Sequence, residues 1–128
     1  GCRLKIKRFE RAMDDVVNNP VLGRLVEKNL RELGVREIVE KDDVPGSTDY
    51  GNVSQVVPSV YFYCATAPRG SELHTGEFTA LSITAQAHKN MLLSVKAMAL
   101  TALDLFSDRE LLQKAVKSFT IRRTAGAA

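Results

Sequence analysis

The sequence has no tryptophan, few aromatic residues of any kind, and two cysteines among its 128 residues. Two cysteines are too few for a disulfide-rich scaffold, and no Cys-x-x-Cys pair is present that would indicate a structural zinc site. Cys2 and Cys64 lie far apart, each in an apolar run, which predicts two reduced thiols that are buried or half-buried. A single disulfide between them stays open.

Long apolar runs and a strong excess of one charge are also missing. No stretch approaches the ~18 consecutive apolar residues of a membrane span, and no signal-peptide pattern opens the chain. The net charge is +3, with basic residues spread over both ends. We therefore expect neither a membrane nor a nucleic acid as partner, and a cytoplasmic location. The chain starts at Gly1 without a Met and runs at once into a strand pattern, which indicates a piece of a longer protein.

Three segments have the pattern of β-strands. Residues 2–7 alternate apolar with basic side chains, as in a strand with one buried face. Residues 35–39 form a second, short candidate, and residues 59–65 are apolar, β-branched or aromatic after Pro58, as in a buried strand. The polar stretch 41–51 is predicted to be a loop.

Three segments have the pattern of helices. Residues 20–33 carry apolar side chains at helical spacing between an Asn19-Pro20 start and a Gly34 stop. Residues 84–106 are apolar over most of a helical circumference, which predicts a long, covered helix packed on a sheet. A capping-box spacing from Ser107 to Glu110 starts a last helix reaching Phe119, and residues 120–128 are predicted to be a frayed tail. Together the pattern predicts an α/β fold with helices on a small mixed sheet.

Two polar segments carry the residues with chemical potential. The first, residues 46–54, has the sequence Gly-Ser-Thr-Asp-Tyr-Gly-Asn-Val-Ser and is either a turn with a helix cap or a site. In a site, the Ser47 and Thr48 hydroxyls and nearby backbone N–H groups would bind an anionic substrate group, and Asp49 would orient them. The second segment contains His74, which taken alone is a surface residue or a metal ligand; His88 receives no role.

Both segments, in this order, resemble a family of metallopeptidases and amidohydrolases that includes aminoacylases, aminobenzoyl-glutamate hydrolases and glutamate carboxypeptidases. Residues 46–58 are similar to the Gly-Ser-Thr-Asp loop, helix and Pro of its amidohydrolase and dipeptidase branch. Residues 74–78, His-Thr-Gly-Glu-Phe, resemble its late His-Thr-x-x-Phe motif, and residues 97–104 its terminal helix. The likeness extends from residue 18 onward.

The resemblance implies a C-terminal part of a zinc-exopeptidase-like catalytic domain. It implies that residues 1–17 are the end of an inserted lid and dimerisation domain with its linker, and that residues 18–128 belong to the catalytic domain. His74 would bind one of two zinc or manganese ions. Ser47, Thr48 and Asn52 would line the substrate end, with Asp49 supporting them. The substrate would be a small acyl amino acid or dipeptide, and the whole enzyme a homodimer.

The remaining metal ligands and the general-base Glu of such enzymes lie, by the same resemblance, upstream of these residues. One imidazole cannot both activate water and transfer a proton to the leaving amine. The chain is therefore expected to be inactive alone, with no catalytic residue of its own and with the missing N-terminal part as its partner. The alternative is a non-catalytic interaction or assembly module; an acidic-ligand or nucleic-acid-binding domain ranks last.

Overall fold

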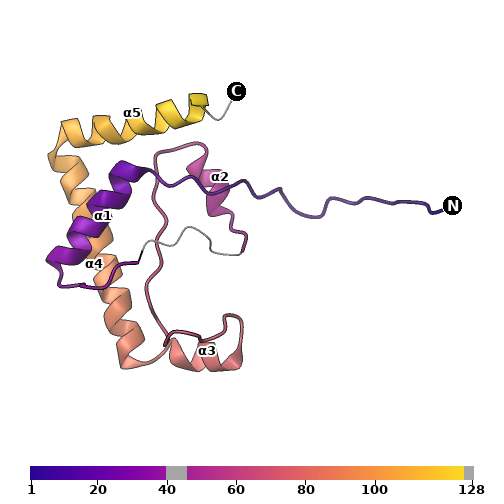
Figure 1. Ribbon diagram of the computed structural model, residues 1–128, viewed down its shortest axis with the longest axis horizontal. Helices are drawn as coiled ribbons and strands as arrows, with labels where there is room; N and C mark the ends of the chain where they lie inside the picture. The colour runs from indigo at the N-terminus through magenta and orange to yellow at the C-terminus, as the bar shows by residue number, and fades with distance from the viewer. Residues whose placement is uncertain (40–45, 126–128) are drawn as a thin grey trace.

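The computed structural model describes residues 1–39 and 46–125, with side chains as far as residue 122. The described residues form five helices: α1 (Pro20–Glu32), α2 (Tyr50–Ser54), α3 (Gly76–Leu81), α4 (Ala85–Ser107) and α5 (Arg109–Ala125). Figure 1 shows α1, α4 and α5 gathered on one side, with α2 and α3 on long connections and the N-terminal segment running away from them.

Helix α1 confirms the helix predicted for residues 20–33. The Asn19 side chain accepts hydrogen bonds from the backbone N–H groups of Val21 and Leu22 at 3.0 and 3.3 Å, and Pro20 occupies the first turn. Gly34 follows the helix with φ of 87°, a conformation that favours glycine and ends the helix. The apolar side chains of the predicted stripe are buried, among them Leu22, Leu25 and Val26.

The two later helices are also confirmed, with corrected ends. The Thr84 side chain caps α4 by accepting from Ala87 N–H at 3.2 Å. The cap of α5 is Asp108 and not Ser107, because the Asp108 carboxylate accepts from Leu111 N–H at 3.0 Å. Helix α5 continues to Ala125, so the prediction of a frayed tail is wrong for residues 120–125, and residues 126–128 lie outside the described part.

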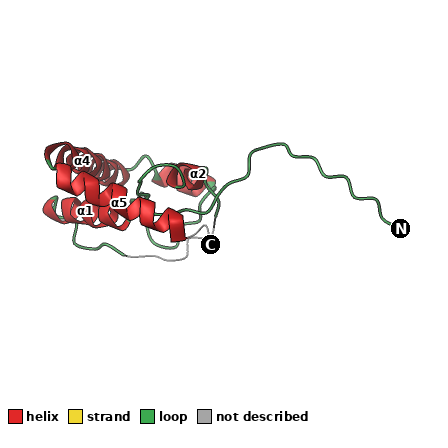
Figure 2. Ribbon diagram, turned by 90° about the horizontal axis from the view of Figure 1, so that it is seen from above, coloured by secondary structure: helices red, strands yellow, loops and turns green. Residues whose placement is uncertain are grey.

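Helices α1, α4 and α5 contact one another pairwise and form what we call the helical body. Figure 2 shows α1 and α4 side by side from above. The buried apolar side chains come from all three helices: Leu22, Leu25, Val26, Ala87, Ala97 and Ala115. Between α1 and α4, the buried Asn29 amide donates to the Thr101 hydroxyl at 3.1 Å and to the Asp104 carboxylate at 3.0 Å. A polar bridge thus fixes how the two helices meet.

The predicted α/β fold is wrong for the part of the chain that the structure describes, since none of its residues is in a strand and no sheet is present. Residues 2–7, 35–39 and 59–65 are irregular or extended segments without a backbone ladder to a neighbour. A strand is stabilised by hydrogen bonds to an adjacent strand, so alternation of side chains is not enough to form one. The helices therefore pack on each other, with no sheet beneath them.

Helix α4 is far less covered than its composition predicted. Large apolar side chains along it are exposed: Met91, Leu92, Val95, Met98, Leu103 and Phe106. By length and composition alone α4 could also cross a membrane, a test that core helices of soluble domains pass as well. The prediction of buried cysteines is wrong too, because Cys2 and Cys64 are free thiols on exposed segments.

Candidate functional site

The polar segment 46–54 forms the turn that starts α2. The Thr48 hydroxyl accepts a hydrogen bond from Tyr50 N–H at 3.2 Å, and Gly51 N–H donates to the Thr48 carbonyl at 3.1 Å. Thr48 is half-buried in this role. Ser47 and Asp49 are exposed, and their side chains make no hydrogen bond or ion pair to a residue that the structure describes. A hydroxyl and a carboxylate therefore remain free at the tip of the turn.

Helix α2 holds the stretch of chain that leads into α1. The Asn52 side-chain amide donates to the Ala12 carbonyl and to the Asp14 carboxylate, both at 3.1 Å. The Gln55 amide donates to the Asp15 carbonyl at 2.9 Å, and the buried Ser54 hydroxyl accepts from Val17 N–H at 3.0 Å. These contacts join residues about 40 positions apart in sequence, so local patterns could not predict them.

Tyr50 and Tyr61 stack with their ring centroids 4.8 Å apart and an interplanar angle of 24°. Burial raises the pKa of the Tyr50 hydroxyl above its ordinary value of 10.0, while the nearby Ser59 side chain lowers it to a smaller extent. The ring pair is anchored by Asn18, whose side chain donates to the Tyr61 carbonyl at 3.1 Å and accepts from Tyr61 N–H at 2.7 Å. The start of α1 and the two tyrosines thus form one connected structure.

His74 lies in an exposed loop just before α3 and has a positive φ of 63°, which is uncommon for a residue other than glycine. The next residue, Thr75, caps α3: its hydroxyl accepts from Phe78 N–H at 3.1 Å and donates to the Glu72 carbonyl at 2.9 Å. Helix α3 was not predicted from the sequence, although Thr75 followed by Glu77 in the first turn is a helix-start signal. The cap holds the loop that presents the imidazole.

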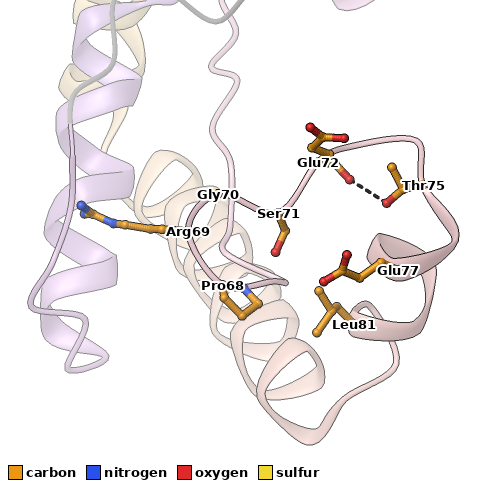
Figure 3. A pocket seen from close by; sticks show the side chains of 8 residues that line it. All are labelled: Pro68, Arg69, Gly70, Ser71, Glu72, Thr75, Glu77 and Leu81. Carbon is orange, nitrogen blue, oxygen red and sulfur yellow. Dashed lines mark hydrogen bonds between the residues drawn. The ribbon is translucent and has the colours of Figure 1, made fainter.

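An open depression of about 470 Å³ lies beside this loop (Figure 3). Two carboxylates, Glu72 and Glu77, border it, while the Arg69 side chain points away from them and pairs with Glu37. The full lining is Pro68, Arg69, Gly70, Ser71, Glu72, Thr75, Glu77 and Leu81. It is a polar, acidic surface next to the predicted metal ligand.

The structure does not bring the two predicted segments together. In Figure 1, α3 lies at one end of the molecule and α2 toward the other, and no hydrogen bond joins His74 to Ser47, Thr48, Asp49 or Asn52. Within residues 1–39 and 46–125, no group of three or more His, Cys, Asp and Glu side chains could hold a metal ion. His74 can therefore supply one ligand, and a complete metal site needs donors from outside the described residues.

No family model matches the chain. Among curated proteins, it is 32% identical over 126 residues to the Xaa-Arg dipeptidase of Homo sapiens, a match that covers 95% of the chain and 28% of the dipeptidase. The Xaa-Arg dipeptidase of Mus musculus is 34% identical over 125 residues, which is 93% of the chain and 28% of that protein. A p-aminobenzoyl-glutamate hydrolase polypeptide of Escherichia coli K12 is 41% identical over 68 residues, 53% of the chain and 14% of that polypeptide. The chain thus spans just over a quarter of the dipeptidases that it matches.

Proposed function

Because the chain belongs to the peptidase and amidohydrolase family of these dipeptidases and aminobenzoyl-glutamate hydrolases, we propose that it is part of a hydrolase that cleaves the amide bond of dipeptides or other small acyl amino acids. The observation that carries this proposal is the match along 95% of the chain to a dipeptidase. Further support comes from the match to a hydrolase that, by its name, acts on another amide of an amino acid. The shared chemistry is hydrolysis of an amide next to a free amino acid.

His74 is the residue that we assign to metal binding. Its imidazole is exposed, sits on a loop held by the Thr75 cap, and lies inside the matched stretch. A zinc or manganese pair would polarise the amide carbonyl and lower the pKa of water, which is the chemistry that this hydrolysis needs. The donors found within the described residues fit one position of such a site and not the whole of it.

The turn before α2 is the part that we assign to the substrate. Ser47 and Thr48 offer hydroxyls, and Asp49 would orient them from the same turn. Asn52, assigned to the same end, already uses its amide nitrogen on residues 12 and 14, so it would contribute through its carbonyl oxygen. In this proposal residues 1–17 end a lid and dimerisation domain, and residues 18–128 belong to the catalytic domain of a homodimer.

The chain by itself is proposed to be inactive, because the match covers 28% of each dipeptidase and the described residues hold no complete ligand set. The test compares the 128-residue chain with the longer protein, both assayed against dipeptides and acyl amino acids with added zinc or manganese. We expect turnover from the longer protein only. Turnover by the 128 residues alone would overturn this part of the proposal.

A pair of histidine variants tests the assignment of His74 in the longer protein. His74→Ala is expected to lower kcat/KM on the order of 100-fold or more and to reduce the bound metal, since loss of a ligand or its support disrupts such sites. His88→Ala is the matched control, because His88 is an exposed imidazole on α4 with no assigned role. Equal activity of the two variants would remove His74 from the site.

The exposed apolar side chains of α4 favour one alternative, a non-catalytic interaction or assembly module. That function predicts a stable assembly without metal in which His74→Ala has no effect. Sedimentation of the metal-free longer protein, together with the His74→Ala assay, separates the two functions.

A further inference from the structure

The stretch of chain before α1 is held from one side by α2. Four residues of α2 and its end, Gly51, Asn52, Ser54 and Gln55, contact residues 12–17, which we call the linker. We infer that these four residues form a clamp that fixes the path of the linker, and so sets where the chain before residue 12 leaves the helical body. None of them was assigned this role from the sequence.

The hydrogen bonds of the clamp are spread along the whole linker. Asn52 holds its beginning through the Ala12 carbonyl and the Asp14 carboxylate, both at 3.1 Å. Gln55 holds the middle through the Asp15 carbonyl at 2.9 Å. Ser54, which is 1% exposed, accepts from Val17 N–H at 3.0 Å and donates to the Gly51 carbonyl at 2.7 Å. Backbone groups of the linker that have no partner in a strand are thus satisfied by side chains of α2.

Gly51 shows that the fit is close. A Cβ atom built on Gly51 would lie 1.8 Å from the Asp14 carbonyl oxygen and 2.7 Å from the Asp14 carbonyl carbon. Both atoms belong to the backbone, so a larger residue at position 51 must push the linker away. Gly23, in the middle of α1, has nothing within 4 Å of the same position. The need for glycine at position 51 therefore comes from the linker and not from the helix.

The clamp has a sharp limit at residue 12. Residues 1–11 are exposed along their length and make no hydrogen bond to a described residue. After the linker, Asn18 is held by Tyr61, and its carbonyl accepts from the Arg122 guanidinium at 2.9 Å. The pivot for whatever precedes the body thus lies between residues 11 and 12, inside the stretch 1–17. Because the turn of Ser47 and Thr48 leads directly into α2, a pull on the linker reaches that turn; this last consequence rests on the proposed function.

Partial digestion with trypsin tests the clamp in the 128-residue chain. Cleavage after Arg8 needs residues 9–11, which lie outside the clamp, whereas cleavage after Arg11 needs residues 12–14, which lie inside it. Mass spectrometry gives the ratio of chains that begin at Ala12 to chains that begin at Phe9. We expect Gly51→Ala to raise this ratio about tenfold and Asn52→Ala about fivefold, since cleavage follows the population of the open form. Gly23→Ala, the matched control, should leave the ratio unchanged.

The digestion also decides against the clamp. An unchanged ratio in both Gly51→Ala and Asn52→Ala, with helical circular dichroism like that of the parent chain, would overturn the inference. If Gly51→Ala loses its helical signal, the double variant Asn52→Ala with Gln55→Ala replaces it, because shortening two exposed side chains adds no atom to the contact. An unchanged ratio in that variant overturns the inference, and a raised ratio supports it. The readout involves no catalysis, so it is independent of the proposed hydrolase activity.

Discussion

Two helices of this chain begin with a side-chain cap, α1 at Asn19 and α3 at Thr75, and the surroundings of the two caps differ. Asn19 is 3% exposed, and besides capping α1 its amide donates to the Ala115 carbonyl of α5 at 2.9 Å. Thr75 caps α3 through bonds within its own loop, and no residue of α3 is buried. The same local device thus belongs to a packed core in one region and stands by itself in the other.

The comparison separates stability from chemistry in this molecule. The helical body is built around buried amides that cross from helix to helix, at Asn19 and Asn29. The segments between α1 and α4 carry the residues assigned to substrate and metal, and these are exposed or half-buried on short helices and turns. We expect substitutions in the body to change the free energy of unfolding, and substitutions in the middle segments to change local order or activity.

The largest effect on stability is expected for Asn29→Ala. The Asn29 side chain is 1% exposed and bridges α1 to Thr101 and Asp104 of α4, so its removal leaves buried polar partners unsatisfied. We expect a loss of about 2–4 kcal/mol in the free energy of unfolding. Gln86→Ala, which removes an exposed amide bonded to Asn90, is the control and should cost less than about 0.5 kcal/mol. Urea denaturation followed by circular dichroism measures both, and equal costs would contradict the separation.

The next largest effect is expected for Asn19→Ala, which removes the cap of α1 and the bond to α5 together. We expect a loss of about 1.5–3 kcal/mol. Asn19→Asp separates the two contributions, because its carboxylate still caps the helix but cannot donate to the Ala115 carbonyl. If the Asp variant is as stable as the parent chain, the contact between α1 and α5 adds nothing and the cap explains the whole effect.

The sequence predicted the helical body well because its signals are local. Asn19, Pro20 and Gly34 mark the ends of α1 by their own backbone and side-chain preferences, whatever the rest of the chain does. The strand predictions failed at residues 2–7, 35–39 and 59–65, because a strand also depends on a neighbour that alternation does not reveal. The exposed apolar residues of α4, such as Phe106 at 89%, show the same limit, since periodicity cannot say whether a face is covered.

The candidate site was predictable only in part, for a related reason. The turn at Thr48 fits the interpretation of residues 46–54 as a turn with a cap, and the roles of Ser47, Asp49 and His74 stay predictions. The clamp around Gly51 could not be foreseen, because its bonds reach residues 37 to 40 positions away in the chain. A glycine and an asparagine inside a short helix were the available signal, and both suit an ordinary turn equally well.

A smaller effect is expected at alkaline pH from Tyr50, which lies at the border of the two regions. Burial raises its pKa above 10.0, so the folded state holds the phenolic proton more tightly than the unfolded state does. The resulting stability is fully present below pH of about 10 and is lost as the pH rises through the folded-state pKa. Tyr50→Phe should flatten the decline of stability in this range, as measured by urea denaturation at a series of pH values. An unchanged decline would show that Tyr50 does not cause it.

The smallest effect on global stability is expected for Thr75→Ala, although it removes a cap of the same kind as Asn19. Because α3 buries no residue, its loss exposes little apolar surface, and we expect the free energy of unfolding to change by less than about 0.5 kcal/mol. The local effect is larger: the amide of Phe78, which donates to the Thr75 hydroxyl, should exchange with solvent about five times faster. Thr79→Ala on the same helix keeps the cap and serves as the control for hydrogen exchange. A global loss as large as that of Asn19→Ala would mean that α3 is part of the stable core, and the division between a structural body and a presenting loop would fail at the residue next to His74.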